Sequence, residues 1–200
     1  MATIKLTKNE LKKQKDALKR FERYLPTLML KKQQLQMVIR QAELAEQEKR
    51  REREAAHAEL VEWIAVFGEE IDLSSLVRVA SVRTDSGNIA GVEIPLFEGM
   101  DFESIPYDLF RVPLWVDRAI EMMKRLLSLD MEAEILKEQV RRLERELRIT
   151  TQRVNLFEKV KIPETRGNIR KIRIYLGDEQ TASVVRGKMA KSAILETRVG

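Results

Sequence analysis

The feature that most constrains this fold is an apolar stripe in the C-terminal half of the chain. Counted back from Phe157 in alternating steps of three and four, the stripe reaches Trp115 through thirteen positions, of which only Thr150 is polar. A seven-residue repeat kept over about six heptads drifts around a straight α-helix, so a left-handed supercoil is needed to hold the stripe against a partner. A single amphipathic helix on a globular core usually ends within about 20 residues. The stripe therefore predicts a coiled coil.

A weaker version of the same pattern in the N-terminal segment provides a partner for this stripe. It runs from Leu11 to Ala42 and contains two polar members, Gln14 and Lys32. The predicted seam consists of Leu18, Phe21, Leu28, Leu35, Ile39, Leu126, Leu129, Leu136, Val140, Leu143, Leu147 and Val154. Because the intervening segment lets the chain fold back on itself, the sequence predicts a mainly α fold, a long antiparallel two-helix coiled coil with a small β-hairpin-containing middle region.

Two prolines fall inside the predicted helices. Pro26 removes a hydrogen bond at a cost of up to about 3 kcal/mol, so we expect a kink or a local break at residues 24–26. Pro163 is expected to kink the C-terminal helix without ending it, because the apolar spacing continues across it at Ile162, Ile169, Ile172 and Leu176.

The middle of the chain reads as two short strands. β-branched residues nearly alternate on either side of Asp85–Gly87, which we interpret as the turn of a hairpin. The predicted hairpin residues are Asn88, Ala90, Gly91, Val92 and Pro95. We expect this hairpin to pack on the far end of the helix pair through Val61, Ile64 and Phe67.

These patterns divide the chain into four predicted segments. Residues 1–66 form the N-terminal coiled-coil helix, and residues 67–112 form the β-hairpin region with its loops. Residues 113–195 form the C-terminal coiled-coil helix, kinked near Pro163, and residues 196–200 form a disordered tail.

Charge is concentrated at the two ends of the chain. The net charge is +5, with 37 Lys and Arg against 32 Asp and Glu, and residues 1–40 and 161–200 are both basic. If the two ends lie side by side, they form a basic tip that would orient the molecule towards an acidic partner or a polyanion. The predicted tip consists of Lys5, Lys8, Lys12, Lys13, Arg186, Lys188 and Lys191.

No pattern for catalysis, a cofactor or a metal is found. The chain has no Cys and one histidine, His57, in a charged helix, and it contains neither a phosphate-binding loop nor a dinucleotide fingerprint. No catalytic, cofactor-binding or metal-binding residues are therefore assigned. The first residues lack the apolar region of a signal peptide, and no apolar run approaches the roughly 20 residues needed to span a bilayer. We expect a cytoplasmic protein with no transmembrane segment.

Three stretches of the chain stand out: NIAGVEIP (residues 88–95), RVNLFEKVKIP (153–163) and LKKQQL (30–35). In order and spacing they resemble the D-subunit family of V-type and A-type rotary ATPases. The resemblance implies a central axle whose two terminal ends enter the ring of alternating A and B subunits. It further implies that the part with the β-hairpin joins the F subunit and the membrane rotor's adaptor subunit, of the C or d type.

Two hypotheses follow. In the first, the chain is a non-catalytic rotor-stalk subunit that carries torque between the A and B head and a membrane rotor moving protons or sodium ions. It binds no nucleotide itself and lies peripheral to the membrane. The alternative is a generic coiled-coil adaptor or a nucleic-acid-associated protein with a basic tip. Nucleic acid is less favoured, because no nucleic-acid-binding motif accompanies the basic ends.

Overall fold

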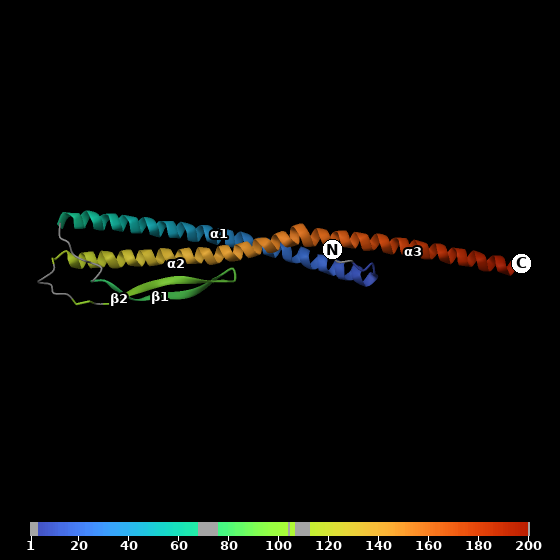
Figure 1. Cartoon of the computed structure of the whole chain (residues 1–200), viewed down its shortest axis with the longest axis horizontal. Coiled ribbons are helices and arrows are strands. Elements are labelled where there is room, and N and C mark those ends of the chain that lie inside the picture. Colours follow the sequence, from blue (N-terminus) through green and yellow to red (C-terminus); the bar gives the residue numbers. More distant parts are fainter. Residues whose placement is uncertain (1–3, 68–75, 104, 107–112, 200) are drawn as a thin grey trace. The chain divides into compact units, whose positions relative to one another are not determined.

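The computed structural model describes residues 4–67, 76–103, 105–106 and 113–199. Its elements are the helix α1 (Lys8–Phe67), the strands β1 (Arg78–Ile89) and β2 (Val92–Glu103), the helix α2 (Val116–Asn155), the π-helix η2 (Leu156–Lys161) and the helix α3 (Ile162–Val199). Figure 1 shows these elements. In the order of the chain, the two strands come after α1 and before α2. The predicted fold class is confirmed: the chain is mainly helical, with one small antiparallel hairpin in its middle.

The chain divides into two compact units, which are described separately. Residues 31–149 form what we call the hairpin unit, and residues 1–30 together with 150–200 form the terminal unit.

In the hairpin unit, α1 and α2 run antiparallel (Figure 1). Ion pairs link Lys31 to Glu146 and Lys49 to Glu132, so that residue numbers rise along α1 as they fall along α2. Two apolar clusters fill the space between the elements of this unit. One contains Ala56, Leu60, Trp115, Val116, Ala119, Ile120 and Leu126, and the other contains Leu35, Ile39, Ile94 and Leu143.

The hairpin turn lies closer to the C-terminus than the sequence predicts. β1 and β2 pair from Arg78–Glu103 to Ile89–Val92, so the two turn residues are Ala90 and Gly91. Both have positive φ, 53° and 78°, as the tight turns that match the twist of a hairpin require. The side-chain oxygen of Asn88 accepts a hydrogen bond of 3.0 Å from the Gly91 N–H, which supports this turn. The turn predicted at Asp85–Gly87 was wrong. These residues are of types common in turns, but they lie within β1 and pair with β2.

The hairpin also packs elsewhere than predicted. Ile94 near its turn is 1% exposed and packs with Leu35, Ile39 and Leu143, which belong to the paired helices of the hairpin unit. Val61, which was expected to hold the hairpin, is 52% exposed, and the side chains of Ile64 and Phe67 lie outside the described residues. The apolar residues at the turn determine this placement, because they can be buried only if the hairpin lies along the helices rather than at their end.

In the terminal unit, α1 begins after Thr7, whose hydroxyl accepts a 3.2 Å hydrogen bond from the Glu10 N–H and so caps the helix. α1 then continues through Pro26 without interruption. The expected local break is therefore absent. A proline removes only its own N–H from the helix, and the turns on both sides keep their hydrogen bonds.

The helix also continues across Pro163, and a π-helix precedes that proline. The Ile162 N–H donates to the carbonyl of Phe157, five residues back, instead of four. Pro163 has no N–H to offer and its ring would clash with the carbonyl of Lys159 in a regular α-helix, so a wider turn at this place relieves the conflict. The Thr165 hydroxyl donates a 2.6 Å hydrogen bond to the Lys161 carbonyl, which satisfies an acceptor in the disturbed region.

The last residues are helical as well. α3 extends to Val199, whereas the sequence predicts a disordered tail over residues 196–200. Residues such as Lys, Ala, Leu, Glu and Arg near this end have high helix propensity and allow the helix to continue.

Candidate functional site

The predicted seam of the hairpin unit lies between its two helices. Leu35, Ile39, Leu126, Leu129 and Leu143 are buried, and Leu136, Val140 and Leu147 are half-buried. Leu35 and Leu143 are both 0% exposed and pack in one cluster. This alternation of buried and half-buried side chains is what two helices in contact along one stripe produce.

The seam residues of the terminal unit are less enclosed. Val154 is 4% exposed, while Leu18, Phe21 and Leu28 are half-buried. The ring of Phe21 lies 5.2 Å from that of Phe157 with the planes tilted by 49°, an aromatic pair that links α1 to η2. Ile162 just before Pro163 is buried, as are Ile169 and Ile172 beyond it, and Leu176 is half-buried, so the apolar stripe continues along α3.

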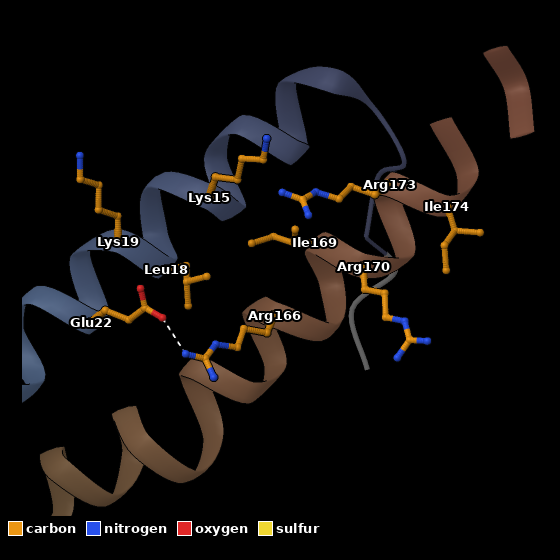
Figure 2. Close-up of a pocket in the computed structure, with 9 residues that line it drawn as sticks. All are labelled: Lys15, Leu18, Lys19, Glu22, Arg166, Ile169, Arg170, Arg173 and Ile174. Atoms are coloured by element: carbon orange, nitrogen blue, oxygen red, sulfur yellow. Dashed lines mark hydrogen bonds and ion pairs between the residues drawn. The ribbon is translucent and has the colours of Figure 1, made fainter. Parts of the chain in front are cut away.

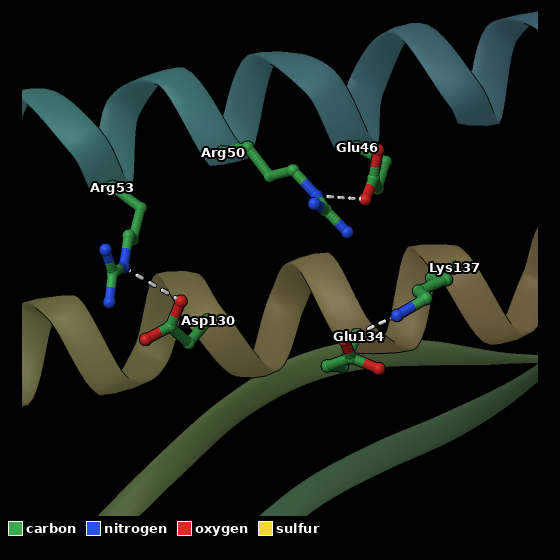
Figure 3. A network of polar contacts seen from close by, with 6 residues as sticks. All are labelled: Glu46, Arg50, Arg53, Asp130, Glu134 and Lys137. Carbon is green, nitrogen blue, oxygen red and sulfur yellow. Dashed lines mark hydrogen bonds and ion pairs between the residues drawn. The ribbon is translucent and has the colours of Figure 1, made fainter.

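Ion pairs flank the seam in the hairpin unit. Lys31 Nζ lies 2.7 Å from Glu146 Oε1, and Arg53 Nε lies 3.1 Å from Asp130 Oδ1. Figure 3 shows the second of these pairs between α1 and α2, together with ion pairs within each helix. The pKa of Lys49 is raised above its ordinary value, chiefly by its hydrogen bond to Glu52, and Glu132 on the facing helix adds to the effect. These contacts set which residues of α1 and α2 face each other.

Polar contacts from α2 hold the hairpin near its turn. The side-chain amide of Gln139, which is 8% exposed, donates a 2.6 Å hydrogen bond to the Pro95 carbonyl. Arg142 donates one of 3.3 Å to the carbonyl of Glu93 and pairs with Glu138. The pKa of Glu138 is lowered from its ordinary value, chiefly by this hydrogen bond from Arg142. The α2 face therefore binds both the apolar side and the backbone of β2.

A basic groove runs between α1 and α3 in the terminal unit. Figure 2 shows its lining residues: Lys15, Leu18, Lys19, Glu22, Arg166, Ile169, Arg170, Arg173 and Ile174. Five of these side chains are cationic and one is a carboxylate. That carboxylate, on Glu22, is paired with Arg166 at 2.8 Å. The other four cations form no ion pair among the described residues, so they can attract an acidic surface.

The structure does not bring the two halves of the predicted basic tip together. Lys5, Lys8, Lys12, Lys13, Arg186, Lys188 and Lys191 are all exposed. Ile4 and Leu6, which flank Lys5, line a pocket with Pro163 and Gly167. That part of α3 precedes Arg186 by roughly 30 Å along the helix. Figure 1 shows α3 continuing past the start of α1, and its side chains from Gly177 to Ile194 are exposed. The basic groove lies where α1 and α3 do face each other.

The predicted hairpin residues cluster around the turn. Ala90 and Gly91 form it, while Asn88 and Val92 flank it. Pro95 lies within β2, opposite Ser86. A proline fits there because each strand of a two-stranded sheet is an edge strand.

Sequence reasoning missed several residues that the structure buries. Gln139, Ile135 and Thr165 are 8%, 9% and 4% exposed, yet none was placed in the seam. Gln139 contacts the hairpin, which makes a second buried face on α2 that a single heptad count does not reveal. The extra residue in the π-helix turn shifts the helix register and so brings Thr165 inwards. Pro163 was the only sign of this shift in the sequence.

Chemical sites of other kinds were sought in the described part of the chain. There, no group of three or more His, Cys, Asp or Glu side chains could hold a metal ion, and His57 is exposed. Nor is any helix in the same ranges both long and apolar enough to cross a membrane.

Comparison with known proteins points to one family. The family profile described as the D subunit of ATP synthase matches residues 10–192. A V-type ATP synthase D subunit from Borreliella burgdorferi is 53% identical over 196 residues, covering 98% of this chain and 97% of the relative. The protein of the same description from Chlamydia muridarum is 39% identical, with 96% of each chain covered. One from Chlamydia pneumoniae is 35% identical, covering 96% of this chain and 93% of the relative. The chain therefore belongs to the D-subunit family of ATP synthases.

Proposed function

We propose that this protein is the central rotor-stalk subunit of a V/A-type ATPase or ATP synthase. In this role it transmits torque between the catalytic head of A and B subunits and the membrane rotor that moves ions. The packed antiparallel helix pair in each unit carries the proposal, together with membership of the family. It acts in the cytoplasm, peripheral to the membrane, as a non-catalytic subunit.

Torque transmission requires that the two helices do not slide past each other. Burying a leucine side chain contributes about 1.5–3 kcal/mol, whereas an exposed ion pair contributes about 0.2–1 kcal/mol. The apolar seam, with Leu35 and Leu143 fully buried, therefore resists separation of the helices. The flanking pairs such as Lys31–Glu146 mainly fix the register between them.

The two units have different partners in this proposal. The terminal unit enters the ring of A and B subunits, and its basic groove with the exposed cations of α3 faces acidic or polar side chains of that ring. The hairpin unit joins the F subunit and the adaptor subunit of the membrane rotor. The protein binds no nucleotide directly, since it acts by its shape and charge.

A reversible cross-link tests this function. The chain has no cysteine, so a single Arg186→Cys on exposed α3 is its only thiol. In the assembled complex, a disulfide from this position to a cysteine introduced in an A or B subunit should stop ATP hydrolysis, and a reducing agent should restore it. Thr84→Cys on the exposed hairpin is the control and should form no disulfide with that ring cysteine.

The result that contradicts the proposal is equally clear. If position 186 becomes fully cross-linked to the ring and ATP turnover continues at the original rate, the chain does not rotate within the ring. Failure of position 186 to reach the ring would contradict the proposed orientation.

A further inference from the structure

The basic groove between α1 and α3 differs in charge from a cleft between the two helices of the hairpin unit. That cleft, between α1 and α2, is lined by two cations and three carboxylates, those of Arg50, Arg53, Glu54, Asp130 and Glu134. The basic groove has the same two-helix setting, yet its lining contains five cations and one carboxylate. Its excess of positive charge is therefore not something that the packing of two helices requires.

Like charges lie next to one another along both helices of the groove. Arg166, Arg170 and Arg173 follow one another at spacings of four and three residues, so they share one face of α3 over about 10.5 Å. Lys15 and Lys19 lie four residues apart on α1. Pairs of like charge at these spacings destabilise a helix. An anion bound in the groove removes this repulsion, so the folded chain favours its binding.

The side chains of the groove converge on one place between the helices. Figure 2 shows Lys15 on α1 and Arg173 on α3 extending towards each other. The one carboxylate of the lining, on Glu22, is already paired with a different arginine of the groove at 2.8 Å. Leu18 is half-buried and Ile169 is buried, and both lie between the helices in the same view. These apolar side chains exclude water from one side of the site, which strengthens contacts between charges.

The lining also selects the chemistry of the anion. Three of the five cations are arginines, and a guanidinium group binds two phosphate oxygens at once. Because these arginines stand in a row, a ligand that reaches all of them carries several negative charges along a line. Among the described residues, none that lines the groove is aromatic, so the bases of a nucleic acid have no side chain to stack on. A phosphate chain without bases fits this lining best.

We propose that the basic groove binds a linear inorganic polyphosphate, with its phosphates held between the arginines of α3 and the lysines of α1. The binding occurs in the chain before it is assembled, because in the proposed function the ring of A and B subunits covers the same groove afterwards. The inference rests on that function in this respect alone. Polyphosphate and the ring then exclude each other, so bound polyphosphate delays assembly.

The first test measures binding of inorganic polyphosphate of defined length to the full chain by isothermal titration calorimetry. Changing both Arg170→Gln and Arg173→Gln should weaken binding about tenfold, because two phosphate contacts are lost. The control changes Lys188→Gln and Lys191→Gln, which are exposed, lie three residues apart on the same helix and carry the same total charge. They lie more than a Debye length from the groove, so binding should stay within about twofold. Equal losses, or no binding by the parent chain, would overturn the site.

A second variant tests the site in the opposite direction. Glu22→Gln removes the one carboxylate of the lining and releases Arg166, so polyphosphate should bind about two- to fivefold more tightly. A misfolded variant cannot produce such a gain. Unchanged or weaker binding would contradict the proposal.

Other polyanions show whether the groove selects a phosphate chain. Single-stranded DNA and polyglutamate are titrated at matched total charge and the same salt concentration, because binding of any polyanion falls steeply with salt. Polyphosphate should bind more tightly than either. Equal or tighter binding of DNA would identify a nucleic-acid site, and equal or tighter binding of polyglutamate would identify a site for an acidic protein; each result would overturn the proposal.

Assembly with the A and B ring separates this inference from the axle function. Polyphosphate at twice its dissociation constant leaves about a third of the grooves free, so the chain should enter the ring about threefold more slowly. A polyphosphatase should restore the original rate. Polyphosphate that binds without slowing entry would overturn the proposed exclusion. A chain that does not lock the ring through position 186 refutes the axle function, whether or not polyphosphate binds.

Discussion

Replacing Leu143 with alanine should destabilise the hairpin unit more than any comparable change in the seam. Leu143 is 0% exposed and packs against Leu35, Ile39 and Ile94, so it joins both helices and the hairpin. The substitution removes three carbon atoms, a transfer loss of about 2.4 kcal/mol, and leaves a cavity that increases the loss. We expect a total of about 3–4 kcal/mol.

Two further variants calibrate this value. Leu136→Ala should cost about half as much, because Leu136 is half-buried. Leu44→Ala should cost less than about 0.5 kcal/mol, because that side chain is 66% exposed. For a chain of this size each kcal/mol shifts Tm by about 2–4 °C, so Leu143→Ala should lower it by roughly 6–16 °C.

Thermal unfolding followed by circular dichroism at 222 nm, with urea titration to confirm the free energies, measures these shifts. Comparable losses for Leu143→Ala and Leu44→Ala would show that the two helices do not meet along this stripe. A larger loss for Leu136→Ala than for Leu143→Ala would show that the register of the seam is different.

Three smaller perturbations test separate parts of the fold. Ala90→Gly should stabilise the hairpin by about 0.5–1 kcal/mol in urea unfolding, because relief of the left-handed conformation exceeds the added entropy of the unfolded chain; a loss of stability would contradict the turn. Pro163→Ala should restore a regular α-helix and slow amide hydrogen exchange at residues 157–165, since position 163 regains its N–H; unchanged exchange would mean that the proline does not cause the π-helix. The lowered pKa of Glu138 stabilises the fold above the ordinary carboxyl pKa, and this contribution is lost as the pH falls through the folded value; Glu138→Gln should therefore lose less Tm than the parent chain between about pH 6 and pH 3, and identical losses would contradict this sign.

The helical part of the fold was predictable because its signal is repeated many times. Thirteen positions between Trp115 and Phe157 share one spacing, so a single polar member such as Thr150 does not obscure the period. In the structure Thr150 is 1% exposed, in line with the stripe despite its hydroxyl. Periodicity averages over residues, and it is therefore robust to individual exceptions.

The hairpin was harder to place because its turn depends on two residues. Asp85–Gly87 and Ala90–Gly91 both offer turn chemistry, and alanine at positive φ is uncommon enough to favour the first of them from sequence alone. The turn forms at Ala90–Gly91, because this placement buries Ile94 against the helices. That contact joins residues about 50 positions apart in the chain, and no local pattern reports it.

The two halves of the predicted basic tip do not lie together, for a related reason. Counting charge at the two ends does not fix which residues of antiparallel helices lie level with each other. The terminal unit pairs Glu22 with Arg166 and Phe21 with Phe157, and this register brings Lys15 and Lys19 towards Arg170 and Arg173 instead. Both ends of the chain are basic, as the sequence shows. Which residues of the two ends lie side by side, however, depends on how the helices pack.

The central claim, that this chain rotates as an axle, is tested most directly by observing the rotation. A biotin attached through Thr84→Cys on the exposed hairpin carries a bead, while the A and B ring of the complex is fixed to a glass surface. On addition of ATP the bead should turn continuously in one direction, and it should stop when the cross-link through position 186 is formed. A bead that stays still while the same complexes hydrolyse ATP would contradict the account.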